Sequence, residues 1–557
     1  MSALPKKAHW PPIYIYLQSA LIAVATWWIT QNLYQDDSYI TLVYVRNWLE
    51  GFGLVWSRGD VPVEGYSNFL FLAVIAGLGW LGVDLVLASR LVNFIGYIGL
   101  VWCLVWFTRA VYHKYYASTE KHYAYQVNSA LCVGLVASSV PILTWCMGGL
   151  EAVFFAFLLT YAVCRILWWL ESGAEHKYAF VTGVIFALAA MTRLEALMVW
   201  GITGIVLGLF WLSRRLATHL NFAKLVLLGA GFLALFVPYM AWKYSYYGDV
   251  LPNTYYAKAF AVSPELLTHF GWFYAFQFLY VPPLLVVCFI GLFLYLYTKT
   301  IPPRSLLYLI SLLALFFWHI IASGGDHMPY LRFFVPVIPL LALALYYMCN
   351  ALIEKRERAF RDVSGALIVL CIFQFGYVSF DGQLSRGALS GKAVAPYVNA
   401  NWPEGSTIAV NPAGALPYYA PNYHYIDMLG LNDKHIAQRE IYLDDADMMR
   451  KIRHRPIGHL KGDGEYVFSR KPDYIIFGDA WGEKKPRFLS DIELFELEGF
   501  AQHYKRVELL VNPPAGLIEP LHVMAEDNLK YKDSPRYVHG PIMEKDQLYF
   551  IYYERID

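Results

Sequence analysis

Long apolar runs dominate this sequence and constrain its fold more than any other feature. They recur along the first two thirds of the chain at lengths of about twenty residues, which a helix needs to cross the hydrocarbon core of a bilayer. Only 16% of the residues are charged, whereas roughly 25% is typical of soluble domains. The sequence therefore predicts an α-helical polytopic membrane protein. Its net charge of +1 lacks the basic excess that a nucleic-acid partner requires.

We expect about eleven spans, at residues 13–29, 88–108, 127–146, 150–170, 178–192, 195–212, 222–243, 273–298, 304–322, 331–350 and 363–380. Lys and Arg concentrate in alternate loops, near 109–126, 214–224, 299–304 and 355–361. The positive-inside rule places these loops in the cytoplasm. The N-terminus is then expected to be cytoplasmic and the C-terminus extracytoplasmic.

The apolar run SNFLFLAVIAGLGWLGV, residues 67–83, does not fit this alternation. Counting it as a span would move every later loop to the other side of the membrane. It is short, interrupted by glycine and bounded by acidic residues, so we expect it to lie on or dip into the outer leaflet. Residues 31–87 then form the first external loop, with helices at the membrane surface.

The composition changes after residue 380, where short strand-like runs alternate with Pro, Gly and Asn turns. The predicted strands are 407–410, 423–426, 474–477, 507–511 and 548–553. We therefore divide the chain into a transmembrane domain, 1–380, and an extracytoplasmic soluble α/β or α+β domain, 381–557. All seven cysteines precede the second domain, in or beside apolar runs. They are expected to be small core residues rather than disulfide partners.

Five polar clusters stand at the external ends of the predicted spans. In order, they are QDDSY with VEGYSNF, GGLEA, TRLEA, YYGDVLPNTYYAK and GGDHMPYLRFF. The first contains adjacent aspartates, Asp36 and Asp37, before a predicted amphipathic helix that ends at Gly51. An N-cap accounts for one aspartate and leaves the other without a structural role. Arg193 and Glu195 in TRLEA are explained either by an ion pair between helix ends or by function, which ionisable residues at this depth favour.

A pocket built from these clusters would combine carboxylates, cations and many aromatic rings. Aromatic planes pack on the faces of sugars, and carboxylates accept hydrogen bonds from sugar hydroxyls. Arg and Lys bind a phosphate that leaves as a dianion, and a carboxylate removes the proton from an attacking hydroxyl. The clusters therefore indicate a sugar donor linked to a lipid phosphate.

The chain resembles the GT-C class of membrane glycosyltransferases, which use polyprenyl-phosphate sugars, in the ordered set of these five clusters. Within that class it is similar to the branch that contains the mycobacterial terminal β-arabinofuranosyltransferase and the pilin arabinofuranosyltransferases. NPAGALPYY and IDMLGLNDKHIA in the soluble domain carry the same resemblance. Two departures, Leu194 in place of proline and His327 in place of tryptophan, would reshape the pocket.

This resemblance implies an inverting glycosyltransferase in a bacterial inner (plasma) membrane, with its active site and soluble domain outside the cytoplasm. The implied donor is decaprenyl- or undecaprenyl-phosphate D-arabinofuranose, and the implied acceptor is a pilin, lipopolysaccharide or cell-wall polysaccharide. Two alternatives stay open, a GT-C transferase of mannose or glucose and a transporter or flippase of lipid-linked sugars. A carrier needs a polar path through the middle of its spans, whereas these spans are nearly free of charge.

The resemblance makes Asp36 or Asp37 the general base and does not choose between them. Arg193, Lys258 and Arg332 are the expected ligands of the donor phosphate. The other predicted site residues, which would bind sugar or acceptor, are Tyr39, Glu64, Tyr66, Asn68, Glu151, Glu195, Asn253, Asp326 and His327. No cofactor is expected to be obligatory, and a divalent cation bridging the aspartates is the alternative.

Overall fold

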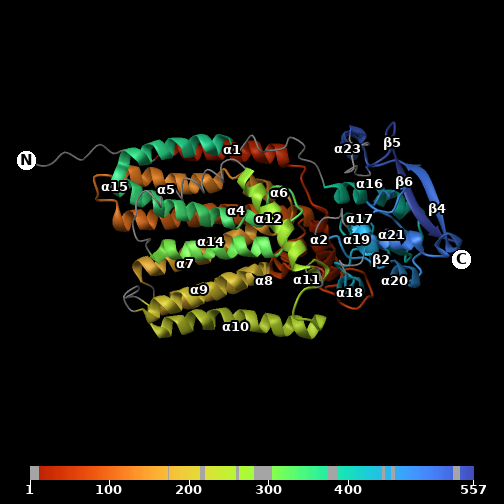
Figure 1. Cartoon of the computed structure of the whole chain (residues 1–557), viewed down its shortest axis with the longest axis horizontal. Helices are drawn as coiled ribbons and strands as arrows, with labels where there is room; N and C mark the ends of the chain where they lie inside the picture. The colour runs from red at the N-terminus through yellow and green to blue at the C-terminus, as the bar shows by residue number, and fades with distance from the viewer. Residues whose placement is uncertain are drawn as a thin grey trace, which may run out of the picture.

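The structure is a bundle of long, roughly parallel helices with a smaller sheet domain at one end (Figure 1). It is a computed structural model that describes residues 12–173, 175–213, 220–258, 263–280, 304–373, 385–441, 446–452, 458–530 and 540–556. The predicted class, a helical polytopic membrane protein followed by a sheet domain, is confirmed.

The bundle consists of α1 (Ile13–Thr30), α4 (Leu85–Tyr115), α5 (His122–Ala137), α6 (Val140–Met147), α7 (Ala152–Ser172), α8 (His176–Thr192), α9 (Glu195–Leu212), α10 (Phe222–Tyr247), α12 (Pro264–Tyr280), α14 (Arg304–Ala322) and α15 (Val337–Phe373). Shorter elements gather at the end that meets the sheet domain, namely α2 (Asp36–Leu49), α3 (Phe69–Trp80), α11 (Asn253–Lys258) and η1 (Arg332–Phe334). We call this end of the bundle the site end.

Within the described residues, seven helices are long and apolar enough to cross a membrane, and an eighth is counted if α5 and α6, bent by 42°, form one span. This count is lower than the eleven spans expected, for three reasons. The helix α8 has 17 residues and falls among the shorter apolar helices. The helix α15 joins two predicted spans across a break at Arg356. The predicted span 273–298 lies largely outside the described residues.

The run 67–83 forms α3, a helix of 12 residues. At 1.5 Å per residue it is about 18 Å long, too short to cross a hydrocarbon core of about 30 Å. The neighbouring α2 differs from the surface helix that the sequence predicts. Its residues Ser38 to Val45 are all buried, because α3 packs on one side of it and the sheet domain on the other.

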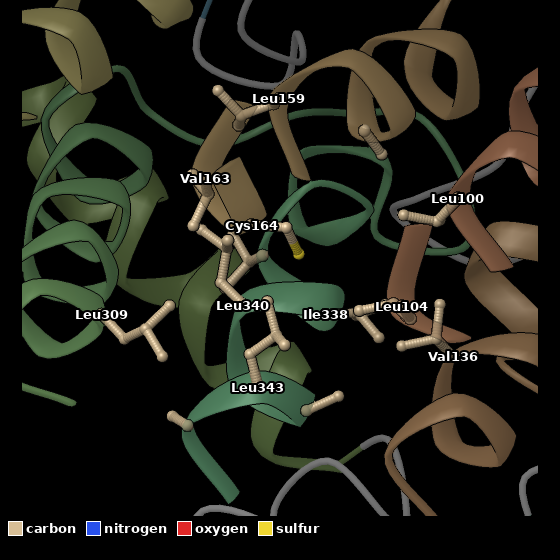
Figure 2. Close-up of a cluster of buried hydrophobic side chains, with 14 of the residues drawn as sticks. Leu100, Leu104, Val136, Leu159, Val163, Cys164, Leu309, Ile338, Leu340 and Leu343 are labelled. Atoms are coloured by element: carbon tan, nitrogen blue, oxygen red, sulfur yellow. The ribbon is translucent and has the colours of Figure 1, made fainter. Parts of the chain in front are cut away.

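The core of the bundle lies where α4, α5, α7, α14 and α15 meet, and it is filled by Leu, Ile, Val and Cys side chains (Figure 2). Cys164 is one of six described cysteines, all of them buried and free, as expected. The seventh, Cys288, lies outside the described residues. The helices α8 and α10 touch through backbone, since a Cβ on Gly183 would lie 2.1 Å from the carbonyl oxygen of Leu228, and one on Gly231 2.0 Å from that of Phe180.

The sheet domain contains β1 (Thr407–Val410), β2 (His424–Asp427), β3 (Tyr474–Ile475), β4 (Tyr504–Val511), β5 (Met543–Glu544) and β6 (Gln547–Arg555). Their order is β2-β1-β3-β6-β4, with β5 on β6. The strand β1 is parallel to β2 and β3, whereas β6 is antiparallel to β3, β4 and β5. The five predicted strands correspond to β1, β2, β3, β4 and β6, within a few residues at each end.

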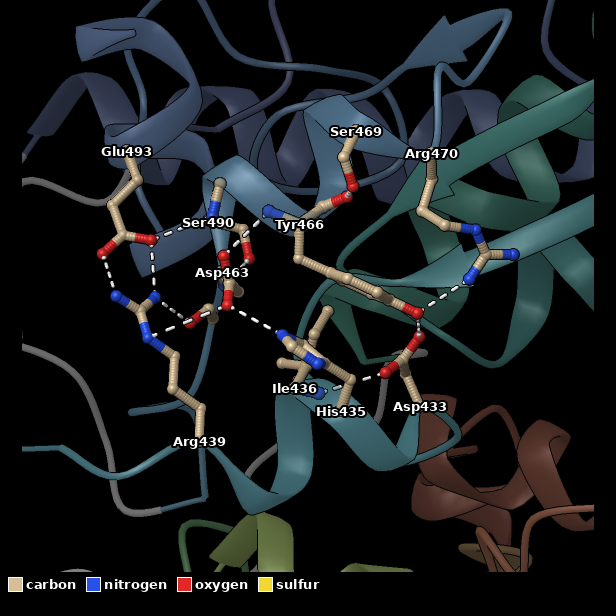
Figure 3. A network of polar contacts seen from close by, with 12 residues as sticks. Asp433, His435, Ile436, Arg439, Asp463, Tyr466, Ser469, Arg470, Ser490 and Glu493 are labelled. Atoms are coloured by element: carbon tan, nitrogen blue, oxygen red, sulfur yellow. Dashed lines mark hydrogen bonds and ion pairs between the residues drawn. The ribbon is translucent and has the colours of Figure 1, made fainter.

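The helices of this domain are α16 (Arg386–Asn401), α17 (Ala415–Tyr419), α18 (Lys434–Gln438), α19 (Ala446–Ile452), α20 (Gly464–Ser469), α21 (Leu489–Glu496), α22 (Phe500–His503) and α23 (Ile518–Lys530), with η3 (Ala515–Leu517). A polar network on the surface ties α18, α20 and α21 together (Figure 3). In it, Arg439 donates to both carboxylate oxygens of Glu493 at 2.6 and 2.8 Å, and His435 contacts Asp463 at 3.0 Å.

Candidate functional site

A cavity of about 270 Å³ opens at the site end of the bundle. The structure brings together most of the predicted site residues around it, namely Asp37, Tyr66, Asn68, Glu151, Arg193, Glu195, Lys258, Asp326, His327 and Arg332. They come from α2, α7, α9, α11, η1 and the loops beside them. All five polar clusters of the sequence therefore contribute to a single cavity, which we call the first cavity.

Arg193 and Glu151 form a buried ion pair in the wall of this cavity. Nη1 of Arg193 lies 2.7 Å from Oε1 of Glu151, and its Nε donates to Oε1 of Glu195 at 3.0 Å. The second oxygen of Glu151 accepts a hydrogen bond from Nδ2 of Asn68 at 2.8 Å. Because both oxygens of Glu151 are held, this wall of the cavity has a fixed geometry.

Arg332 and Lys258 supply two further cations. Nε of Arg332 donates to Oδ2 of Asp326 at 2.6 Å, and the Arg332 side chain is only 8% exposed. The Lys258 side chain is 33% exposed, and its Nζ lies 3.6 Å from Oδ2 of Asp37. Lys258 is thus the most accessible cation of the three and the one nearest to Asp37.

Asp37 is held in its ionised form. Burial acts to raise its pKa, but the charge of Lys258, aided by His327 and Arg332, outweighs burial and holds the pKa below its ordinary value. A carboxylate that stays ionised is able to accept a proton. Asp37 therefore faces the cavity in the state that a general base needs.

Asp36 has a different environment. Its Oδ1 accepts from the backbone N–H of Ala415 at 2.8 Å and its Oδ2 from that of Gly414 at 3.0 Å, while its own N–H donates to Oγ of Ser385 at 2.9 Å. A Cβ on Gly414 would lie 2.0 Å from the carbonyl oxygen of Asp36, so only glycine fits there. Burial raises the pKa of Asp36 to about 7 although these backbone hydrogen bonds oppose the rise. Through these hydrogen bonds Asp36 links α2 to the sheet domain.

Besides Asp36, three predicted site residues lie outside the lining of the first cavity. The hydroxyl of Tyr39 is 3.2 Å from that of Tyr419 in the sheet domain. Glu64 is paired with the buried Lys243 at 2.8 Å. Nδ2 of Asn253 donates to the carbonyl oxygens of Gly430 at 2.9 Å and Leu431 at 3.0 Å. Tyr39 and Asn253 thus connect the two domains. Glu64 does not line the first cavity, although Gly65 and Tyr66, the next residues in the sequence, do.

A second cavity, of about 250 Å³, lies between α2 and the sheet domain. Asp37 and His327 line both cavities. The sheet domain contributes polar residues that sequence reasoning missed, namely Arg386, Asn411, His459, Asp479 and Arg487. They are scattered over a hundred residues of sequence, and no local pattern marks them.

His319 and Lys243 were also missed, although the sequence contains a signal for both. Each is an ionisable residue in an otherwise apolar helix, α14 and α10, and such residues suggest function or a buried partner. His319 lines the first cavity, and Lys243 pairs with Glu64.

The part of the chain that the structure describes contains no group of three or more His, Cys, Asp or Glu side chains placed to hold a metal ion. The expectation that no metal is obligatory stays a prediction.

Comparison with known proteins identifies relatives of the fold. Residues 378–530 match a family described as a domain of unknown function, DUF8728. No curated protein sequence matches the chain.

Among solved structures, ArnT from Cupriavidus metallidurans in the apo state is similar, with a TM-score of 0.54, 12% identity and 97% of each chain covered. The same protein bound to undecaprenyl phosphate gives 0.54, 11% and 97% of each chain. The archaeal oligosaccharyltransferase AglB from Archaeoglobus fulgidus, in complex with an inhibitory peptide and a dolichol-phosphate, gives a TM-score of 0.49 at 10% identity, covering 98% of this chain and 88% of that one. The likeness to ArnT shows a GT-C-type fold, a membrane bundle with a C-terminal sheet domain.

Proposed function

We propose that this chain is a membrane glycosyltransferase that moves a sugar from a polyprenyl phosphate to an acceptor hydroxyl, with Asp37 as the general base. The observation that carries the proposal is the position of Asp37, which belongs to two cavities at once and faces three cations in the first. The fold shared with ArnT, which has been solved with undecaprenyl phosphate bound, supports this class of lipid.

The first cavity suits a donor with one phosphate. Lys258, the most exposed of the three cations, is the proposed direct ligand of that phosphate. Arg332 hydrogen-bonds Asp326 through Nε, and its terminal nitrogens are the proposed donors to the phosphate. Arg193 is the third cation that lines this cavity, and we call the part formed by Lys258, Arg332 and Arg193 the positive wall. Together the three cations would stabilise a phosphate that leaves as a dianion.

The sugar would lie in the first cavity beside Asp37 and the phosphate. Asn68, Tyr66 and Glu151 are the proposed contacts of its hydroxyls, since all three line the cavity and Asn68 holds Glu151 in place. An oxocarbenium-like transition state carries positive charge on the ring, and the fixed carboxylate of Glu151 would stabilise it. Glu195, Asp326 and His327 shape the remaining wall.

Asp37 would remove the proton from the acceptor hydroxyl as its oxygen attacks the anomeric carbon on the face opposite the phosphate. Such an in-line displacement inverts the anomeric configuration. The chemistry requires no metal, because the cations of the protein take the charge of the leaving phosphate.

The resemblance of the sequence favours D-arabinofuranose as the sugar and a pilin, lipopolysaccharide or cell-wall polysaccharide outside the cytoplasm as the acceptor. It also favours a bacterial inner membrane with the site end extracytoplasmic. Mannose and glucose donors are the alternative within the same fold.

The test uses the full chain in lipid nanodiscs with synthetic polyprenyl-phosphate arabinofuranose and a cell-envelope fraction, followed by mass analysis for products that gain a pentose. Asp37→Asn should lower turnover about a hundredfold or more, the usual contribution of a general base. Asp36→Asn, the matched variant of the adjacent residue, keeps the base and should lose far less.

Full turnover in Asp37→Asn would refute the assignment of the base. Transfer of hexoses but not pentose would replace the sugar and keep the mechanism. Movement of the donor across the bilayer, without transfer to any acceptor, would identify a flippase instead.

A further inference from the structure

The turn that follows β2, residues 427–433, brings the sheet domain to the first cavity, and we call it the β2 turn. Leu431 in this turn lines both cavities. Asp427, the last residue of β2, is fully buried. Its Oδ1 accepts from the backbone N–H of Leu429 at 3.0 Å, and its Oδ2 accepts from the backbone N–H and the Nδ2 of Asn432 at 2.8 and 2.9 Å. Because Nδ2 of Asn432 faces this carboxylate, its Oδ1 points away from Asp427, toward the bundle.

Oδ1 of Asn432 lies against loop 63–68, four residues of which line the first cavity, namely Gly65, Tyr66, Ser67 and Asn68. The hydroxyl of Tyr44, on α2, accepts from the backbone N–H of Gly65 at 2.9 Å. Its proton is shared between the carbonyl oxygen of Val63 at 2.7 Å and Oδ1 of Asn432 at 3.1 Å. A Cβ on Gly65 would lie 1.9 Å from Oδ1 of Asn432, so nothing separates the loop from the turn. The loop is therefore held by α2 and the β2 turn together.

The same turn holds α11, the short helix that ends at Lys258. Nδ2 of Asn253, the first residue of α11, donates to the carbonyl oxygens of Gly430 at 2.9 Å and Leu431 at 3.0 Å. The backbone N–H of Asn253 donates to the carbonyl oxygen of Glu64 at 2.9 Å. Loop 63–68 and α11 therefore meet at the β2 turn, which contacts both.

The bundle itself holds loop 63–68 from the side of α10. Nζ of Lys243 lies 2.8 Å from Oε2 of Glu64. The hydroxyl of Tyr247 lies 2.9 Å from that of Tyr66. These contacts fix the loop against α10, whereas the proposed ligand of the donor phosphate is on α11. A displacement of about 1 Å between groups that bind one substrate costs about a hundredfold in rate, so the position of the loop relative to α11 matters for the donor.

We infer that the β2 turn positions the donor site, and that Tyr44 and Asn253 are the positioning residues through which it acts. This inference rests on the proposed function. Tyr44 holds loop 63–68, which carries the proposed contacts of the sugar, and Asn253 holds α11, which carries the proposed ligand of the phosphate. Neither side chain lines the first cavity. Changes at the two residues should therefore produce different defects, one for the sugar and one for the phosphate.

Tyr44→Phe removes the hydroxyl and keeps the ring in the apolar core. With the full chain in nanodiscs, kcat/KM should fall about tenfold or more for the synthetic polyprenyl-phosphate arabinofuranose or hexose that the wild type transfers, because the sugar contacts are displaced. Undecaprenyl phosphate has no sugar, so its affinity should stay within about twofold of the wild type. Native mass spectrometry in detergent measures that affinity.

The control is Tyr423→Phe, which changes a buried tyrosine of the sheet domain. Its hydroxyl donates to the carbonyl oxygens of Val398 at 2.9 Å and Trp402 at 3.1 Å, so the control also removes two hydrogen bonds to backbone. It should leave transfer and lipid affinity unchanged. Backbone amides of loop 63–68 should exchange with solvent faster in Tyr44→Phe only, since Gly65 loses its acceptor there.

Asn253→Ala should weaken the binding of undecaprenyl phosphate about tenfold, because α11 loses its hydrogen bonds to the β2 turn and Lys258 moves with it. The control is Asn399→Ala, which also removes an amide that donates to a backbone carbonyl, that of Tyr419 at 2.9 Å. This control should bind the lipid as the wild type does.

Three results would overturn the inference: Tyr44→Phe transfers sugar as well as Tyr423→Phe does, Tyr44→Phe loses as much lipid affinity as Asn253→Ala does, or Asn253→Ala binds the lipid as well as Asn399→Ala does. If the wild type transfers no sugar but Asn253→Ala still weakens lipid binding, the proposed function fails while the positioning of α11 remains. If transfer depends on Asp37 but not on Tyr44, the function stands and the inference fails. A wild type that binds no undecaprenyl phosphate would overturn both.

Discussion

Asp36 and Asp37 have the same side chain and are separated by about 100° around one helix, yet their neighbours give them opposite roles. The carboxylate of Asp36 is bound by two backbone N–H groups of the sheet domain, and that of Asp37 lines an open cavity beside Lys258. The sequence could show that one of them exceeded the needs of a helix cap. It could not say which, because the partners of Asp36 lie almost four hundred positions away.

Asp36 should make stability depend on pH. Burial raises its pKa to about 7 from the ordinary 3.8, so between these values the folded chain binds a proton that the unfolded chain has lost. The contribution of Asp36 to the free energy of unfolding therefore falls as the pH rises from about 4 to about 7. Asn does not titrate, so the melting temperature of the wild type minus that of Asp36→Asn should decrease between about pH 5 and about pH 8. Thermal unfolding of both proteins in one detergent measures it, and a constant difference would contradict the assignment.

Lys258 should matter for donor binding. If Lys258 holds the donor phosphate, Lys258→Met should raise the apparent KM for the polyprenyl-phosphate sugar about tenfold, since it removes a charge-assisted contact. The matched control is Lys434→Met, which removes an exposed pairing with Asp249. Initial rates over a range of donor concentrations give both constants. An equal effect of the two variants would point to general electrostatics.

At the scale of elements, local patterns predicted what local forces decide. Strand β1 matches its predicted residues 407–410, because a short β-branched run between Gly and Pro turns has few alternatives. The burial of α2 could not be predicted from its own residues, because one side of the helix is buried only by the sheet domain, which is distant in the sequence. The same holds for the site. The five clusters could be assigned to one side by charge, whereas Asn411 and His459 become site residues through tertiary packing alone.

The contact between α8 and α10 should tolerate no side chain at Gly231. A Cβ there meets the backbone of α8, so Gly231→Leu should force the helices apart and cost about 1–3 kcal/mol or more. Gly229→Leu, two positions away, is the control, because a Cβ on Gly229 meets nothing within 4 Å. Melting temperatures in detergent should fall for the first variant only. A fall of the same size in both would mean that helix propensity, not packing, is responsible.

For the whole molecule, the main feature is that the site end of the bundle and the sheet domain share one apolar core. Side chains of α2 and α3, such as Tyr44 and Phe71, belong to the same buried cluster as Val410 and Leu416 of the sheet domain. Arg46 of α2 reinforces the junction by donating to the carbonyl oxygens of Pro417 and Tyr418. The sheet domain is therefore a structural part of the site.

Arg46→Met should loosen this junction while both domains stay folded. Backbone amides of α17 should exchange with solvent faster, because the helix loses the hydrogen bonds that hold its last carbonyls against α2. Hydrogen exchange followed by mass spectrometry of the segment around α17 measures the change. Arg58→Met, which removes a pairing with Glu50 on the same loop, is the control and should leave α17 unaffected. Unchanged exchange in Arg46→Met would assign the junction to apolar contacts alone.

The break of α15 at Arg356 sets the parity of the membrane crossings. One arm of α15 leaves the site end, where η1 lies, and the second arm returns beside α1, where Gln18 donates to the carbonyl oxygen of Ile368. The chain then resumes at Ser385, whose N–H donates to Tyr34 at the site end. Without this second arm, the sheet domain would lie on the opposite face of the membrane from Asp36, to which it donates two hydrogen bonds. Because Asp36 and Ser385 lie at the same end of the bundle, the number of membrane crossings between them is even. A related chain with this architecture could therefore gain or lose crossings there only in pairs.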